Sequence, residues 1–192
     1  MFSRRLLLFA TLSANLCACG LLAPRPDLGP VGPGEFAVSG RLGVNRGEDG
    51  FSSSFSWHQA GDDFEIELWG PLGQGRTRLE GRNGRVTIHA ADGEVTVESD
   101  TAATMERWLG FSVPVAALVH WIRGEPAPGI PVTEQRIEAG ERVALDQLDW
   151  QLEFARWNDV AGHHVPGRII ARRGPVKVTL LPKDWSFSPA SL

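Results

Sequence analysis

Side chains that could act as nucleophiles, general bases or metal ligands are scattered along this chain. No two histidines have the i, i+4 spacing with which a helix presents two zinc ligands, and no serine has the Gly-x-Ser-x-Gly context of a hydrolase nucleophile. The adjacent His163 and His164 lie between Gly162 and Gly167, a composition that favours a solvated loop. The other histidines stand apart, at His58, His89 and His120. We therefore predict that the protein is not an enzyme and binds neither a metal nor a cofactor, and a hydrolase remains a less favoured alternative.

The two cysteines, Cys17 and Cys19, lie at the end of an N-terminal apolar run. Arg4-Arg5 precede the run, which extends from Leu6 to Leu16 and is far shorter than the ~20 residues of a membrane-spanning helix. This pattern indicates an export signal, residues 1–18, that is removed. The tetrapeptide Leu16-Cys17-Ala18-Cys19 resembles a bacterial lipobox, in which the thiol of the last cysteine receives lipid.

Cys19 fits the modified position better than Cys17, because the choice of Cys17 would place the bulky Leu16 immediately before the cleavage site. We predict that Cys19 is the lipidated first residue of the mature protein; an ordinary cleaved leader with two incidental cysteines is the alternative. Bacterial lipoproteins carry two ester-linked acyl chains and usually an amide-linked one, which together anchor a protein firmly. Gly20 follows Cys19, in place of the Asp that retains lipoproteins at the inner membrane. We therefore expect an outer-membrane protein that faces the periplasm.

Composition divides the mature chain into a tether and one domain. Residues 19–34 are rich in proline and glycine and lack a hydrophobic period, as in a semi-extended linker. Residues 35–192 are enough for a single domain with its own core. Without the leader, 17 basic residues face 23 acidic ones, so the net charge is −6. That balance argues against nucleic acid as a partner.

Alternation of apolar and polar residues predicts antiparallel strands. It is clearest in Phe51, Phe55 and Trp57, and again in Phe64, Ile66 and Leu68. Two dipeptides that tolerate positive φ, Asn83-Gly84 and Asp92-Gly93, predict tight hairpin turns. Further strands are expected from Phe36 to Asn45, at Val143–Leu145, from Trp150 to Phe154 and from Val176 to Leu180.

Helical spacing predicts two short helices in the middle of the chain. The first carries Ala102, Met105 and Trp108-Leu109, and the second follows Pro114 with Val115, Leu118, Val119 and Ile122. Six or more strands, two helices and then three or four strands predict an α+β fold, mainly β. Its core would be a single curved antiparallel sheet forming an open (incomplete) β-barrel, with helices on the concave apolar face. The alternation does not decide whether side chains fill the concave space or leave a cavity.

The segment Trp69-Gly70-Pro71-Leu72-Gly73 predicts a turn with an apolar residue at its tip. Pro71 suits the second position of a four-residue turn and Gly73 the fourth, which places Leu72 between two strands. A leucine there either folds back under the sheet or projects to meet an apolar partner. If it projects, its burial contributes roughly 1.5–3 kcal/mol, enough for a reversible contact.

These features together resemble one family, the outer-membrane lipoprotein receptor LolB of the Lol lipoprotein-sorting system. The resemblance extends from about Phe36 to Trp185. It rests on the lipobox, Phe36 followed by Gly40-Arg41-Leu42, Trp57, the Gly70-Pro71-Leu72-Gly73 loop and a helical segment from Gly110 to Gly124. The chain departs from the family pattern in having Trp-Gly before Pro71 and a long proline-rich connection after Gly124.

The resemblance implies an open barrel in which short helices plug an apolar cavity that accepts lipoprotein acyl chains. The implied partners are a periplasmic LolA-like carrier, the acyl chains and outer-membrane phospholipid, and the protein is expected to be a monomer. The loop of Leu72, with Trp69 and Pro71, would pass the cargo to the membrane. From alternation alone, the candidates that face the cavity are Phe55, Trp57, Phe64, Ile66, Leu118 and Ile122. A passive assembly lipoprotein that binds protein partners on the same sheet is the main alternative.

Overall fold

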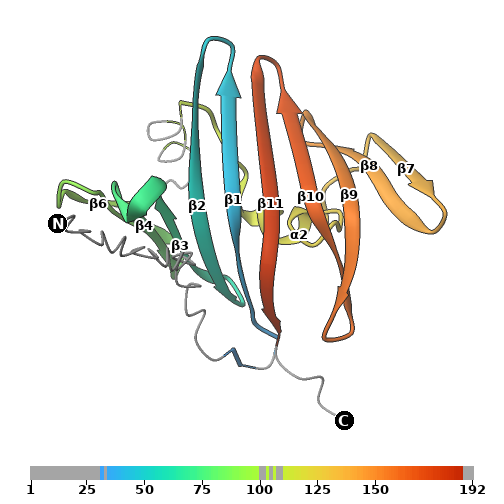
Figure 1. Ribbon diagram of the computed structural model, residues 1–192, viewed down its shortest axis with the longest axis horizontal. Helices are drawn as coiled ribbons and strands as arrows, with labels where there is room; N and C mark the ends of the chain where they lie inside the picture. Colours follow the sequence, from blue (N-terminus) through green and yellow to red (C-terminus); the bar gives the residue numbers. More distant parts are fainter. Residues whose placement is uncertain (1–30, 33, 100–102, 104–105, 107–109, 188–192) are drawn as a thin grey trace, which may run out of the picture.

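The computed structural model describes residues 31–32, 34–99, 103, 106 and 110–187. This part of the chain forms one eleven-stranded antiparallel sheet with the short helix α2 (Val115–Trp121) on one face (Figure 1). The first six strands are β1 (Phe36–Arg46), β2 (Asp49–Ala60), β3 (Asp63–Trp69), β4 (Thr77–Arg82), β5 (Arg85–His89) and β6 (Val95–Glu98). The last five are β7 (Glu134–Glu138), β8 (Glu141–Gln147), β9 (Trp150–Val160), β10 (His163–Arg173) and β11 (Val176–Phe187).

The first and last strands meet at the centre of the sheet. The strand order is β6-β5-β4-β3-β2-β1-β11-β10-β9-β8-β7, so a meander of hairpins extends to each side of the β1–β11 pair. The edge strands β6 and β7 do not pair with each other, and the sheet curves without closing into a barrel (Figure 1). The prediction of a mainly β fold with one curved, open antiparallel sheet is therefore confirmed.

Two glycines allow close approaches within the sheet. The register between β1 and β11 shifts at Ser39/Gly40, and a Cβ on Gly40 would lie 2.2 Å from the carbonyl oxygen of Leu181 and 3.0 Å from the Phe55 ring. On β4, a Cβ on Gly81 would lie 2.1 Å from the ring of Phe64 on β3. Any larger residue at either position must displace backbone or an aromatic side chain.

The predicted hairpin turns are found where expected. Asn83 (φ 52°) and Gly84 (φ 72°) join β4 to β5, and both have the positive φ that a two-residue hairpin turn requires. Gly93, with φ 90°, lies in the connection between β5 and β6.

The C-terminal half contains five strands instead of the predicted three or four. Alternation missed β7 because all of its residues, Glu134–Glu138, are exposed and no apolar face repeats. The prediction of a solvated loop at His163-His164 is also wrong, because both residues begin β10 and pair with β9. Only Ile169–Arg173 of β10 pair with β11, so Pro166 lies where the strand has a single neighbour. Proline, which has no N–H, is tolerated in a sheet at such edge positions.

Of the two predicted helices, the second is confirmed as α2, which follows Pro114. The first, built on Ala102, Met105 and Trp108-Leu109, falls at positions that lie outside the described residues. The same is true of Cys19 and of the export signal.

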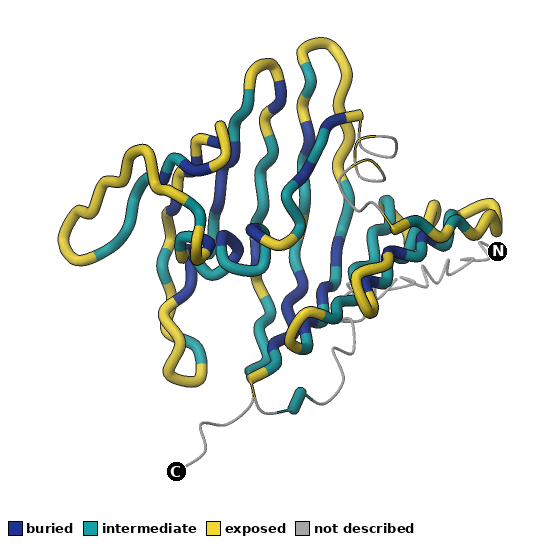
Figure 2. The backbone as a smooth tube through the Cα atoms, turned by 180° about the vertical axis from the view of Figure 1, so that it is seen from behind, coloured by how far each residue is buried: buried dark blue, intermediate teal, exposed yellow. Residues whose placement is uncertain are grey.

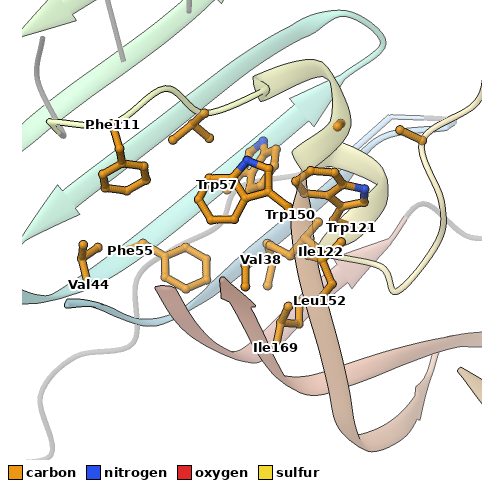
Figure 3. Close-up of a cluster of buried hydrophobic side chains, with 14 of the residues drawn as sticks. Val38, Val44, Phe55, Trp57, Phe111, Trp121, Ile122, Trp150, Leu152 and Ile169 are labelled. Carbon is orange, nitrogen blue, oxygen red and sulfur yellow. The ribbon is translucent and has the colours of Figure 1, made fainter. Parts of the chain in front are cut away.

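The buried side chains gather on the concave face. Figure 2 shows buried residues along the long central strands and exposed ones at the turns and along β7. Figure 3 shows Trp121 and Ile122, at the end of α2, beside Trp150 and Leu152 of β9, and the ring centroids of Trp121 and Trp150 are 6.5 Å apart. The helix thus rests on the sheet through its C-terminal turn.

Candidate functional site

A pocket of about 510 Å³ lies on the concave face of the sheet, a volume typical of small-molecule sites. Its wall is built from 29 residues, of which none is charged. They come from strands on both sides of the β1–β11 pair, from α2 and from the segment before α2. Besides tryptophan indoles, the polar side chains on the wall belong to Ser52, Ser53, Gln74 and Thr77.

All six candidates that alternation assigned to the concave face lie on this wall: Phe55 and Trp57 of β2, Phe64 and Ile66 of β3, Leu118 of α2 and Ile122 after it. Their contact with acyl chains stays a prediction. Successive residues of a strand point to opposite faces, and that period, with the register that pairs Trp57 with Ile66, brings the four strand residues together.

Sequence reasoning did not assign the opposite wall, which includes Phe111, Trp150, Leu152 and Leu180. The rings of Phe111 and Trp150 lie 6.1 Å apart, and both residues are buried. The alternation of Trp150 and Leu152 was visible in the sequence. This alternation does not predict that β9 faces β2 and β3 across the pocket, because that arrangement depends on the curvature of the sheet.

One buried glutamine positions α2 and the proline-rich connection that follows it. The Gln147 carboxamide oxygen accepts hydrogen bonds from Trp121 Nε1 and from the backbone N–H of Ala127, both at 2.9 Å. Its Nε2 donates to the carbonyl oxygens of Ala127 and Ile130 at 2.9 and 2.8 Å. All four bonding positions of the side chain are used, so Gln147 is buried at little cost.

The loop between β3 and β4 presents Leu72 to solvent. Pro71–Gly73 form a single 3₁₀ turn, and Gly70 N–H donates to the carbonyl oxygen of Gln74 at 2.8 Å across its base. Leu72 has φ 63° and a relative accessibility of 101%. Its side chain therefore projects from the turn and does not fold back under the sheet. A left-handed, fully exposed leucine is costly to the fold and stabilises nothing within it.

The base of this loop is part of the pocket wall. Trp69, Gly70, Gln74 and Gly75 line the pocket, whereas Leu72 points away from the fold. The Arg76 guanidinium lies 5.1 Å from the Trp69 ring centroid. The exposed leucine and the opening of the pocket are therefore neighbours.

The histidines of the described segments have partners of different kinds. His164 stacks on Trp157 with ring centroids 5.0 Å apart, and its Nδ1 lies 2.7 Å from Asp159 Oδ1. Burial, followed by the nearby Arg123 charge, lowers the pKa of His120 on α2, with an opposing contribution from Glu125. Among the described residues, no group of three His, Cys, Asp or Glu side chains is placed to hold a metal ion.

A family model described as outer membrane lipoprotein LolB matches residues 34–185, nearly the whole sheet together with the loop of Leu72. The chain belongs to the LolB family. The outer-membrane lipoprotein LolB of Chromohalobacter salexigens is 32% identical, covering 96% of this chain and 92% of its own. The LolB of Alkalilimnicola ehrlichii is also 32% identical and covers 96% and 98%.

Two solved structures share the overall fold of this chain. A LolA superfamily protein from Nitrosomonas europaea aligns with a TM-score of 0.51 over 80% of this chain and 86% of its own, at 8% identity. A DUF1329 family protein from Desulfovibrio piger aligns with a TM-score of 0.52 over 82% and 87%, at 10% identity. Within the described ranges of the chain, no helix has the length and apolar character needed to cross a membrane.

Proposed function

We propose that this protein is a receptor at the outer membrane that accepts the acyl chains of lipoproteins in its concave pocket and passes them to the membrane. The observation that carries the proposal is an uncharged, mainly apolar pocket whose rim bears a fully exposed leucine. Membership in a family of outer-membrane lipoproteins fits this role. The donor would be a periplasmic carrier like LolA, and the receptor would act as a monomer, anchored by lipid on Cys19 and facing the periplasm.

Transfer of this kind needs no covalent step. Each CH₂ group shielded from water contributes about 0.8 kcal/mol, so a lipoprotein with several acyl chains does not cross the periplasm with its chains exposed. A pocket lined by Phe55, Trp57 and Leu152 offers those chains an environment close to that of a carrier or a bilayer. Handover from pocket to pocket avoids the cost of exposure to water.

Leu72 would act at the last step. Entry of one leucine side chain into lipid contributes roughly 1.5–3 kcal/mol, enough to hold the mouth of the pocket against the bilayer for a short time and too little to anchor the protein. The adjacent indole of Trp69 suits the interface between headgroups and acyl chains. Contact with the membrane at this loop would give the cargo an apolar path out.

Uptake of an apolar fluorescent probe tests the pocket directly. The mature chain, residues 19–192 without attached lipid, should bind the probe and release it when a triacylated lipoprotein is added. The same lipoprotein stripped of its acyl chains should leave the probe bound. The alternative function, a scaffold that binds protein partners on a filled sheet, predicts no probe uptake, and that result would overturn the proposal.

A further inference from the structure

Apart from the tryptophan indoles, the polar side chains of the pocket wall lie together at one end. Ser53 is on β2 next to Ser54, which pairs with Trp69 at the end of β3. Thr77 begins β4 and pairs with Leu68, and Gln74 lies in the loop between these two strands. We call Ser53, Gln74 and Thr77 the mouth collar.

The collar marks the open end of the pocket. Of the wall residues, only Phe51, Ser52, Gln74 and Gly75 are exposed, and all four lie at the start of β2 or in the loop before β4. The far end is formed by buried residues of α2 and of the strands beneath it, among them Trp121 of the helix and Trp150 of β9 (Figure 3). The pocket therefore has an apolar floor and a polar rim, which fits an amphiphile that enters with its hydrocarbon tails first.

The collar retains hydrogen-bonding capacity. Neither the Thr77 hydroxyl nor the Gln74 carboxamide forms a hydrogen bond with another group in the described part of the chain. The Ser53 hydroxyl donates to the carbonyl oxygen of Ser54 at 2.7 Å, a bond that rotation of the hydroxyl can exchange for another. By alternation, Ser53 shares the inner face of β2 with Phe55, and Thr77 shares the inner face of β4 with Leu79.

We propose that the mouth collar binds the carbonyl oxygens of the ester groups that join acyl chains to the glycerol of a lipidated cysteine. The inference rests on the proposed function, because it assumes that the tails fill the pocket. With the tails on the apolar floor, the ester carbonyls come to the rim and lose part of their water there. Hydroxyl and amide donors replace that water, and they place the glyceryl group at the mouth, beside Leu72.

If the mouth collar has this role, it binds ester-linked chains more tightly than chains joined by a similar linkage without a carbonyl group. An ether-linked analogue has equal apolar tails and fills the same floor, but it offers the collar no carbonyl acceptor. One net hydrogen bond corresponds to about a two- to tenfold difference in affinity. We therefore expect a preference of about that size for the ester.

The test uses two fluorescent diacylglyceryl-cysteine peptides that differ only in ester or ether linkage, each titrated into the mature chain, residues 19–192 without attached lipid. The wild-type protein should bind the ester several-fold more tightly. Thr77→Val and Ser53→Ala should each reduce ester affinity about two- to tenfold and leave ether affinity unchanged. Thr87→Val, on the outer face of β5, is the matched control and should change neither affinity.

The outcomes separate this inference from the function on which it rests. Equal affinity of the wild-type protein for ester and ether overturns the collar and leaves the receptor function standing. A parallel loss of both affinities in Thr77→Val also overturns it, because the hydroxyl would then serve only the shape of the pocket. Failure of the wild-type protein to bind either peptide overturns the receptor function itself. The wild-type comparison needs no variant, so it decides the question even where a substitution impairs folding.

Discussion

The indole N–H of Trp121 donates a hydrogen bond of 2.9 Å to the side-chain oxygen of Gln147, joining helix α2 to the end of β8. The same glutamine binds the backbone at Ala127 and Ile130, and therefore fixes both α2 and the connection after it against the end of β8. A polar side chain that lies between β8 and the helix thus determines where the apolar helix rests.

Gln147→Leu should destabilise the protein by about 2–4 kcal/mol, because it leaves buried donors and acceptors of Trp121, Ala127 and Ile130 without partners. Urea unfolding measures the change. Gln135→Leu, at an exposed position of β7, is the control and should stay within about 0.5 kcal/mol of wild type. Equal stability of the two variants would show that Gln147 does not hold the helix in place.

Leu118→Glu should lower the affinity for an apolar probe by at least about tenfold, since a carboxylate on the pocket wall loses water without gaining a partner. Ala116→Glu adds the same charge on the exposed side of the same helix and should leave binding unchanged. Fluorescence titration of the probe measures both. Similar losses in the two variants would point to a general effect of charge on α2, not to the pocket.

Gly81→Ala should cost about 1–3 kcal/mol, because the added methyl group would lie 2.1 Å from the Phe64 ring and must displace it. The displaced ring lines the pocket, so probe binding should weaken as well. Gly43→Ala serves as the control, since a Cβ there meets nothing within 4 Å. If denaturant midpoints of the two variants agree, Phe64 is not held against Gly81.

His120 should make the protein less stable in mild acid. Burial and the Arg123 charge lower the pKa of His120 below its ordinary value of 6.5, so the unfolded chain takes up this proton more readily than the folded one. Stability is then unaffected by this group well above pH 6.5 and falls as the pH drops through and below that value. His120→Gln should reduce the loss of stability between about pH 7 and pH 5.

NMR titration of the His120 ring tests the cause. Arg123→Gln should raise the pKa of His120 toward its ordinary value, because it removes the second-largest cause of the shift. A wild-type His120 that titrates above pH 6.5 would contradict the burial seen on α2.

The parts of the fold that local patterns determine could be predicted. Alternation in Phe51–Trp57 and Phe64–Leu68 placed two strands and their inner faces, and Asn83-Gly84 placed a hairpin, because strand period and turn conformation depend on neighbouring residues. β7 could not be predicted, since it is exposed on all its residues and is held by backbone pairing with β8.

The pocket itself lay beyond the reach of local patterns. Phe55 on β2 and Leu152 on β9 have the alternation expected of a filled core as well as of a hollow one, and only the curvature of the sheet separates these possibilities. The direction of the Leu72 side chain could not be predicted for a similar reason. A turn sequence places the residue at the tip, but whether its side chain folds back depends on the room beneath the sheet.

Transfer of a labelled triacylated lipoprotein from carrier to liposomes tests the central claim most directly. The wild-type protein, Leu72→Glu and Leu148→Glu are compared as mature chains without attached lipid. Leu148 is a suitable control because it is also an exposed leucine with positive φ (41% accessible, φ 53°) at a turn, and it does not line the pocket.

We expect all three proteins to take cargo from the carrier, and the wild type and Leu148→Glu to deliver it. Leu72→Glu should deliver it about ten- to a hundredfold more slowly, since one apolar side chain no longer enters the bilayer. Delivery by Leu72→Glu at the wild-type rate would contradict the role of the loop. Failure of the wild-type protein to remove lipoprotein from the carrier would contradict the receptor function.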